Sequence, residues 1–293
     1  MVGCSTLCCP ALPALETALA IQDHPDDYND LKRAVALLES PSLTAKLSAL
    51  VGSPLEGAVK VLPGPLAKRI NGAVKAALHT SAEAALWSLD NRPKTAASTR
   101  LHTFYAAASG ALGGAFGAPA LFVELPVSTT LMMRAVADIA RSEGFDLTDM
   151  ATKQACIEVF ALGGPNDSDD AAETGYYLTR TFTSRTLQHL SRELVVRQGA
   201  SVVKNLNPAQ AGKWLALLIE KVATRFGVTI SSKFAAQAVP VIGALSGATI
   251  NTLFTRFYQD MARGHFIVKR LEARYGFDEV KQAYTELCQM PVR

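Results

Sequence analysis

Apolar residues recur along the chain at helical spacing. One predicted helix, which begins at Gly64-Pro65, carries a single apolar stripe made of Leu66, Ile70, Val74 and Leu78. Proline and N-cap signals such as Ser40-Pro41 open further helices. The longest β-branched run, Val228-Thr229-Ile230, is too short to build a sheet. The pattern predicts an all-α fold of about ten to twelve helices.

Helix ends are predicted from glycine and proline. Gly144, Gly227 and Gly276 are expected to end helices, and Pro126 is expected to lie at the start of one. The polar stretch 90–98 reads as a loop, but the helices before it are too few to fold alone. We therefore expect an N-terminal tail over residues 1–25 and one helical domain over residues 26–293.

Two uncharged segments rich in small residues stand out from this pattern. The first Gly-rich segment, residues 104–123, contains Gly110, Gly113, Gly114 and Gly117, spaced three and four residues apart. The second Gly-rich segment, residues 234–254, contains Pro240, Gly243 and Gly247. Glycines at this spacing form a flat strip on a helix, where another backbone can approach closely. A glycine in a helix lowers helix stability by about 1 kcal/mol relative to alanine. Closer packing or a function is therefore expected to compensate for the glycines in this strip.

Each Gly-rich segment leads into a similar helix. Residues 130–141 and 252–263 both fit the pattern TL-x2-R-x3-D-x-AR. We interpret the two units as pseudo-repeated Gly-rich helical hairpins at the centre of a single domain, with the N-terminal helices wrapped around them.

Several of these motifs resemble a known family. The stretches ASGALGGAFG, ELPVSTTLMMRAVADIA, VFALGGP, AAETGYYLTR, ATRFGV, PVIGALSGATINTLF and RGHFIVKRLEARYGFDEV are similar to those of the EcsC family, from about Leu31 to Tyr284. The family takes its name from a gene that neighbours an ABC transporter. The resemblance implies a transport-associated role and no particular reaction.

The matched helices place charges among apolar residues. Arg134 and Asp138, like Arg256 and Asp260, are four residues apart and so share a helix face. Buried charges must be paired, so one interpretation is a set of ion pairs that fix helix register. The alternative interpretation makes Arg134 and Arg256 a site for a phosphate or carboxylate head group beside Gly113, Gly114, Gly117, Gly243 and Gly247.

Other polar residues are weaker candidates for a site. Arg180 and His265 are candidate ligand-binding residues, although a lone histidine is usually a satisfied core or surface group and Arg180 is better explained by packing than by catalysis. Glu124 is expected either to cap a helix near Pro126 or to be a buried acid. Glu124, Asp138 and Asp260 are the candidate catalytic carboxylates of an alternative function, a carboxylate- or metal-dependent hydrolase acting on a membrane-derived substrate.

Composition narrows the functional classes. The net charge is +3, too small to indicate nucleic-acid binding, and the sequence contains no Walker loop, zinc-ligand spacing or Gly-x-Ser-x-Gly elbow. We therefore expect no cofactor and no bound metal. The Gly-rich segments have the length of a bilayer span, but their proline and polar residues favour tightly packed central helices over insertion.

The N-terminus and a predicted basic helix indicate where in the cell the protein is located. Residues 59–78 place Lys60, Lys68, Arg69 and Lys75 beside an apolar stripe, a pattern that fits an anionic membrane surface and ordinary amphipathic packing equally well. The sequence around Cys4 resembles the end of a lipoprotein signal, which would require residues upstream of this chain. We expect a cytoplasmic protein peripheral at the inner membrane, with a lipoprotein anchored through Cys4 as the alternative.

These observations predict a non-enzymatic, membrane-associated helical protein. Its expected ligand is a membrane lipid or an apolar small molecule, and an ABC transporter component is a candidate partner.

Overall fold

The computed structural model describes residues 20–51, 63–88, 97–115, 120–162, 175–181, 208–237 and 244–290. Over these ranges the chain is helical and contains no strand, which confirms the predicted all-α fold. The elements are η1 (Ile21–Asp23), α1 (Pro25–Leu38), α2 (Leu43–Val51), α4 (Gly64–Ser88), α5 (Thr99–Ala115), α6 (Ala120–Ser142), α7 (Met150–Glu158), η2 (Val159–Ala161), α9 (Pro208–Gln237), α10 (Ala244–Tyr275) and α11 (Phe277–Gln289). Residues 175–181 are also helical.

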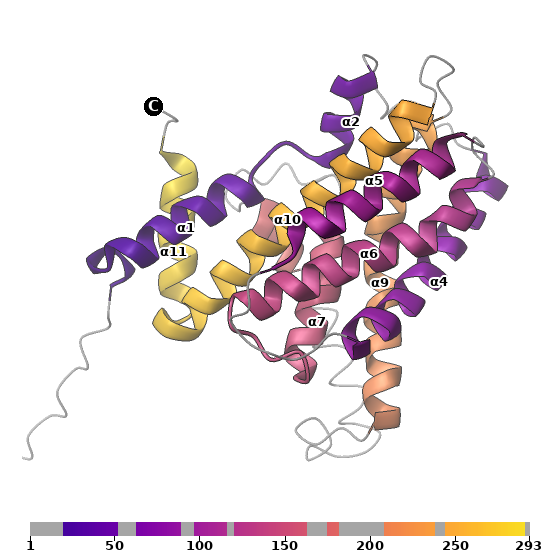
Figure 1. The fold of residues 1–293 in the computed structure, drawn as a ribbon. Coiled ribbons are helices and arrows are strands. Elements are labelled where there is room, and N and C mark those ends of the chain that lie inside the picture. Colours follow the sequence, from indigo (N-terminus) through magenta and orange to yellow (C-terminus); the bar gives the residue numbers. More distant parts are fainter. Residues whose placement is uncertain are drawn as a thin grey trace, which may run out of the picture.

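Helix α10 is the axis of the molecule (Figure 1). Its first half lies along α5, and its second half lies along α1 and reaches α11. Helices α5, α6 and α4 run side by side, and α9 crosses behind them to pack against α4. The four helices α4, α5, α6 and α10 therefore form a continuous layer, and α9 closes its back.

Two glycines make a close helix–helix approach in this layer. A Cβ atom added to Gly110 of α5 would lie 2.3 Å from the carbonyl oxygen of Gly247 in α10 and 2.8 Å from Cβ of Asn251. No side chain fits there, so glycine lets α5 and α10 meet backbone to backbone. The parts of the two Gly-rich segments that lie in α5 and α10 are therefore side by side, as the sequence predicted. Gly113 and Gly114 belong to the last turns of α5, whereas Gly117 and Gly243 fall outside the described residues.

The two predicted hairpins do not have the same packing. Helices α5 and α6 pack against each other, whereas α9 and α10 touch only slightly and α9 packs on α4 instead. The structure therefore does not confirm the predicted pseudo-repeat, although the sequences of the two units match.

Two predicted helix ends lie inside helices. Gly227 does not end α9, which continues to Gln237. The glycine serves packing instead, because an added Cβ would lie 2.3 Å from Oδ1 of Asn71 in α4. Pro126 lies within α6, which begins at Ala120, so the prediction that Glu124 caps a helix near Pro126 is wrong. Gly144 and Gly276 do end helices, with φ of 93° and 90°.

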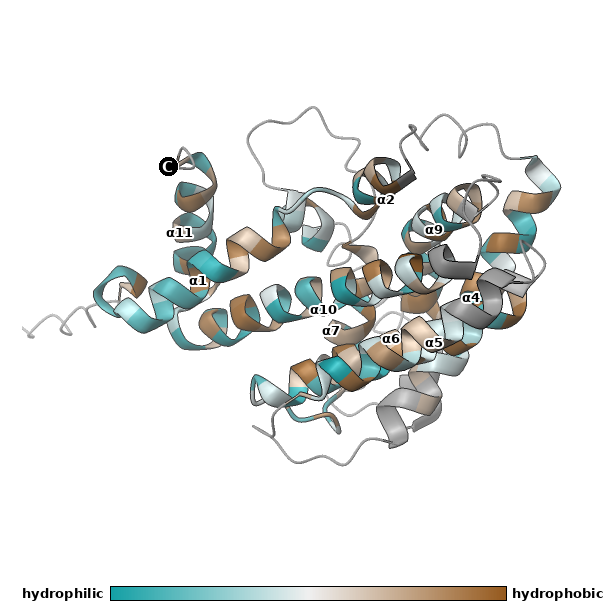
Figure 2. Ribbon diagram, turned by 45° about the horizontal axis from the view of Figure 1, so that its top comes forward, coloured by the Kyte–Doolittle hydropathy of each residue, from teal (hydrophilic) through white to brown (hydrophobic). Residues whose placement is uncertain are grey.

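Apolar bands recur along α1, α10 and α11 with hydrophilic residues between them (Figure 2). The buried sides meet in one core, where the rings of Phe160, Phe226 and Tyr258 pack with centroids 5.0 to 5.6 Å apart. Across the described ranges, no helix combines the length and the apolar character that crossing a membrane requires.

Candidate functional site

A groove with a volume of about 670 Å³ lies between α4, α5 and α6. It is lined by Thr80 of α4, by Leu101, His102 and Tyr105 of α5, and by Pro126, Val127, Thr130, Leu131 and Arg134 of α6. This volume lies within the range of about 300 to 1,000 Å³ that is usual for small-molecule sites. We refer to it as the α4–α6 groove.

Helical spacing explains how these side chains gather. On α5, Leu101 and Tyr105 are four residues apart, and on α6, Val127, Leu131 and Arg134 follow one stripe. Leu101, Tyr105 and Val127 remain exposed, so the wall of the groove is apolar and open. Among the described lining residues, Arg134 alone has a permanent charge. The groove therefore combines an apolar wall with one cation.

Thr130 joins α6 to α4 below the groove. Its hydroxyl donates to the carbonyl oxygen of Pro126 at 2.8 Å and lies 3.1 Å from the hydroxyl of Ser81. These two contacts fix the hydroxyl of one polar residue of the lining.

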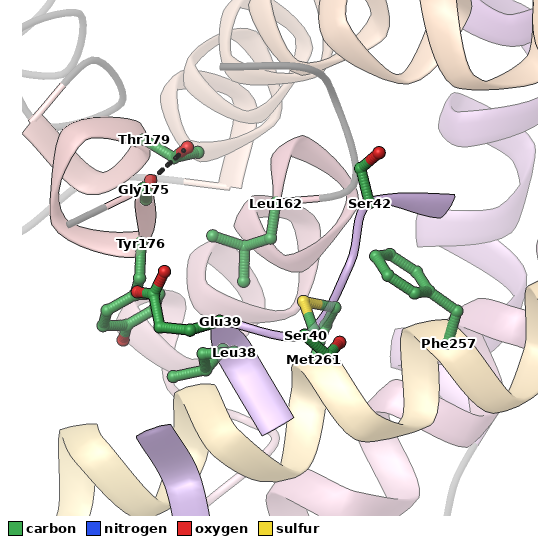
Figure 3. A pocket seen from close by; sticks show the side chains of 10 residues that line it. All are labelled: Leu38, Glu39, Ser40, Ser42, Leu162, Gly175, Tyr176, Thr179, Phe257 and Met261. Atoms are coloured by element: carbon green, nitrogen blue, oxygen red, sulfur yellow. Dashed lines mark hydrogen bonds between the residues drawn. The ribbon is translucent and has the colours of Figure 1, made fainter. Parts of the chain in front are cut away.

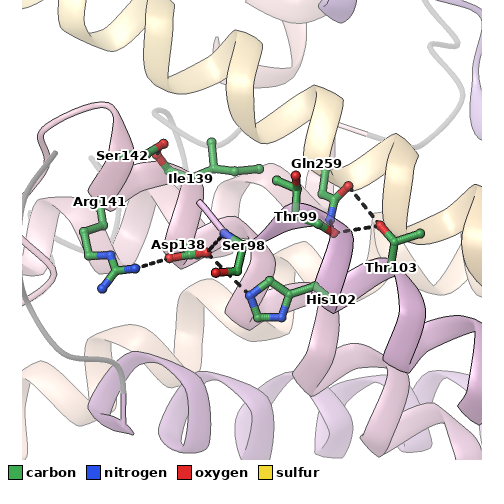
Figure 4. A network of polar contacts seen from close by, with 9 residues as sticks. All are labelled: Ser98, Thr99, His102, Thr103, Asp138, Ile139, Arg141, Ser142 and Gln259. Atoms are coloured by element: carbon green, nitrogen blue, oxygen red, sulfur yellow. Dashed lines mark hydrogen bonds and ion pairs between the residues drawn. The ribbon is translucent and has the colours of Figure 1, made fainter. Parts of the chain in front are cut away.

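The carboxylate of Asp138 ties the start of α5 to α6 beside the groove residue His102 (Figure 4). Its Oδ2 accepts the backbone N–H of Ser98, at the start of α5, at 2.5 Å. The guanidinium of Arg141, one turn along α6, pairs with Oδ1, and Nε2 of the groove residue His102 lies 3.6 Å from Oδ2. Burial alone would raise the pKa of Asp138, but His102, the Ser98 N–H and Arg141 together lower it.

The first turn of α5 is also tied to α10. The amide of Gln259 donates to the carbonyl oxygen of Thr99 at 3.0 Å, and the Thr103 hydroxyl donates to Oε1 of Gln259 at 3.4 Å (Figure 4). The α5 wall of the groove is therefore fixed from both sides, by Asp138 of α6 and by Gln259 of α10.

Glu124 lies in a closed polar cluster where α5, α6, α9 and α10 meet. Nζ of Lys233 donates to its two carboxylate oxygens at 3.2 and 2.9 Å, and the amide of Asn251 donates to Oε1 at 2.6 Å. All three side chains are buried. Burial lowers the pKa of Lys233, an effect that the neighbouring Glu124 opposes. The sequence correctly indicated a buried acid at Glu124 but did not single out Lys233.

The sequence around Lys233 indicates a buried, paired lysine only weakly. It lies one turn before the end of α9, between buried residues from Ile230 to Phe234, and a lone lysine in such a run is the expected mark of a paired internal charge. The cluster adjoins the Gly110–Gly247 crossing, since Asn251 contacts both. Its geometry suits a structural role.

The charged residues of the second matched helix, residues 252–263, have different surroundings from those of the first. Arg256 is exposed, and Asp260 is half-buried. Burial raises the pKa of Asp260, and Lys46, Arg263, Arg256 and Arg33 oppose this effect. The two arginines of the matched motif are therefore not equivalent: Arg134 lines the groove, and Arg256 faces solvent.

Arg180 and His265 lie in a third region. Arg180 forms a bidentate pair with Glu272, in which Nη2 lies 2.9 Å from Oε2, and its guanidinium lies over the rings of Tyr176, Tyr177 and Phe277. His265 is completely buried, with Nδ1 3.0 Å from the Tyr176 hydroxyl. Burial holds the pKa of His265 well below its ordinary value, with further lowering from Lys269 and Arg180.

A smaller pocket of about 110 Å³ adjoins this third region (Figure 3). Leu38, Glu39 and Ser40 line one side, Gly175, Tyr176 and Thr179 another, and Ser42, Leu162, Phe257 and Met261 complete it. Tyr284 donates to Oε1 of Glu39 at 2.8 Å. The pocket has room for a few water molecules only. Within the described residues, no three His, Cys, Asp or Glu side chains gather in a way that could hold a metal ion.

The helical fold and the groove define an all-α protein with an open, largely apolar cleft on its surface. The sequence model of the EcsC protein family matches residues 36–271, most of the chain. The chain belongs to the EcsC family. Comparison with curated proteins gave no match, and neither did comparison with solved structures.

Proposed function

We propose that this protein binds an anionic amphiphile, a lipid-like molecule with a phosphate or carboxylate head, in the α4–α6 groove. The observation that carries the proposal is the combination of a groove of about 670 Å³, lined by apolar side chains, with Arg134 as its one permanently charged residue. An alkyl chain would lie along Leu101, Tyr105, Val127 and Leu131, and the head group would face Arg134.

The chemistry of arginine suits this role. Its planar guanidinium stays charged at any physiological pH and presents several donors to phosphate or carboxylate oxygens. The apolar wall contributes roughly 25 cal/mol for each Å² of alkyl surface removed from water. Binding of this kind requires no catalytic group, so the proposed activity is non-enzymatic.

The hydrolase alternative has less support from the geometry. Glu124 contacts Lys233 and Asn251, Asp138 contacts Ser98 and Arg141, and neither carboxylate lines the groove. Asp260 lies on the part of α10 that faces α1 and α2. The three carboxylates therefore do not converge on a common substrate position.

Membership of the EcsC family supports a wider setting for this binding. We propose that the protein works at the inner membrane and supplies its ligand to an ABC-type transport or secretion system. Co-purification of a transporter subunit from detergent-solubilised membranes would support this setting, and its absence after chemical crosslinking would contradict it.

Calorimetric titration with monomeric alkyl phosphate, in the absence of membranes, tests the binding proposal. We expect Leu101→Asp to weaken binding at least about tenfold, because a carboxylate in the groove repels the head group and wets the wall. Leu217→Asp on α9 is the matched control, since Leu217 is also an exposed leucine but lies outside the groove. Equal affinities for the two variants and the unmodified protein would contradict the proposal.

A further inference from the structure

We propose that the outer faces of α5 and α6 form a docking surface for an anionic lipid bilayer, from which the ligand enters the groove laterally. The surface consists of Phe104 and Tyr105 of α5 and Val123 and Val127 of α6, which we call the α5–α6 ridge. This inference rests on the proposed function, because it supplies the route by which an amphiphile reaches the groove.

The ridge contains the two most exposed large hydrophobic side chains that the structure describes. Val123 is 77% exposed and Phe104 is 67% exposed, the two highest values among the large hydrophobic residues that the structure describes. Tyr105 and Val127 are each about half exposed. Such side chains gathered on neighbouring helices mark an interaction surface, and aromatic rings favour the boundary between head groups and acyl chains.

The ridge is continuous with the groove. The rings of Phe104 and Tyr105 are in contact, with centroids 6.0 Å apart. Tyr105 and Val127 belong both to the ridge and to the lining of the groove. A bilayer in contact with the ridge would therefore meet the open side of the groove, so an amphiphile could move between them without crossing water.

The charge of this face identifies the partner. From Thr99 to Ala137 the sequence contains one acidic residue, Glu124, and it is buried against Lys233. Arg100 is exposed at the start of α5, and Arg134 lines the groove. The face thus offers cations and no exposed carboxylate, which complements anionic lipid head groups.

The same charge pattern argues against a second copy of the chain as the occupant. A two-fold symmetric dimer would place this face against itself, and the face has the exposed Arg100 but no exposed carboxylate over residues 99–137 that could pair with it. Such a dimer would gain apolar contact but no compensating negative charge. A bilayer provides both an apolar interior and negative charge.

Sedimentation with vesicles tests the inference. We expect the protein to bind vesicles of equimolar phosphatidylcholine and phosphatidylglycerol, and to bind pure phosphatidylcholine vesicles more weakly. Phe104→Ser should reduce partitioning to the anionic vesicles about tenfold, because one inserted ring is lost. Val228→Ser, at an exposed valine of α9, should partition as the unmodified protein does. Unchanged partitioning of Phe104→Ser would overturn the inference.

Alkyl phosphate titration of the Phe104→Ser variant separates the ridge from the groove. Unchanged affinity shows that the variant is folded and that its lost vesicle binding belongs to the ridge. If the unmodified protein binds no alkyl phosphate yet docks on vesicles through Phe104, the proposed function fails and the ridge stands. If Phe104→Ser instead changes a dimer into a monomer and leaves partitioning unchanged, the face is a self-association surface and the inference is overturned.

A direct measurement of insertion completes the test. Phe104→Trp should be quenched by lipids with brominated acyl chains, whereas Val228→Trp should not. Both variants keep the two native tryptophans, so the difference between them reports the added residue. Equal quenching of the two variants would overturn insertion of the ridge.

Discussion

Gly110 is the residue on which the central helix crossing depends. Gly110→Ala would place a methyl group 2.3 Å from the Gly247 carbonyl oxygen, against backbone that cannot easily move. We expect it to lower the free energy of unfolding by roughly 1 to 3 kcal/mol, the usual cost of overpacking. Denaturant titration measures the change.

Gly72 is a matched control in the interior of α4, where an added Cβ has nothing within 4 Å. Gly72→Ala should raise stability by up to about 1 kcal/mol, because alanine has the higher helix propensity. Opposite signs for the same substitution would confirm that Gly110 is retained for packing, and equal signs would refute it.

The Glu124–Lys233 pair is expected to be costly to break. Lys233→Met leaves a buried carboxylate without its cation, and we expect a loss of roughly 3 to 5 kcal/mol in denaturant titration. Adding Glu124→Gln removes the uncompensated charge, so the double variant should recover a large part of the loss. If the double variant is less stable than Lys233→Met alone, the unpaired Glu124 carboxylate is not the cause of the loss, and this account of the pair is contradicted.

His265 makes stability depend on pH. Burial lowers its folded pKa well below 6.5, and the groups that face it are Tyr176, Glu158 at 3.9 Å, Arg180 and Lys269. The unfolded chain takes up a proton as the pH falls through about 6.5, while the folded protein does not, so stability falls in that direction by up to about 1.4 kcal/mol per pH unit. His265→Gln should reduce this slope between about pH 6.5 and 5. An unchanged slope would show that His265 does not cause it.

At the scale of the helices, the two matched motifs provide a paired test. Asp138 holds the start of α5 and has a lowered pKa, so the stability that it contributes is present above its ordinary pKa and is lost as the pH falls. Asp260 has a raised pKa, so its ionised form costs stability at neutral pH.

Asn substitutions should therefore have different effects at neutral pH. Asp138→Asn should destabilise the protein by roughly 3 kcal/mol, because Arg141 and the first turn of α5 lose a buried charged partner. Asp260→Asn should be neutral or slightly stabilising. Thermal unfolding of the two variants provides the comparison, and losses of equal size would indicate that the two helices play equivalent parts after all.

The sequence predicted most element types but not how equivalent elements pack. Gly276 was correctly predicted to end a helix. In the structure its φ is positive and nothing occupies the space beside it, so the turn itself is the reason for the glycine. Gly227 could not be distinguished from it by local pattern, because the reason for that glycine is Asn71, more than 150 residues away. The matched Arg/Asp motifs likewise predict helices correctly, but their surroundings come from different neighbours.

At the scale of the whole molecule, the groove illustrates the same limit. The sequence made Arg134 a candidate for head-group binding, but the lining of the groove is assembled from residues such as Thr80, Leu101 and Leu131 on three separate helices. No local window contains these residues together. Lys233 was missed for a related reason, since its partner Glu124 lies on another helix.

The most direct test of the account is a crystal structure of the protein grown with an alkyl phosphate. The account predicts an alkyl chain along Leu101, Val127 and Leu131 and a phosphate group at the guanidinium of Arg134. A ligand bound elsewhere on the protein, or a groove that stays empty at saturating ligand, would contradict it.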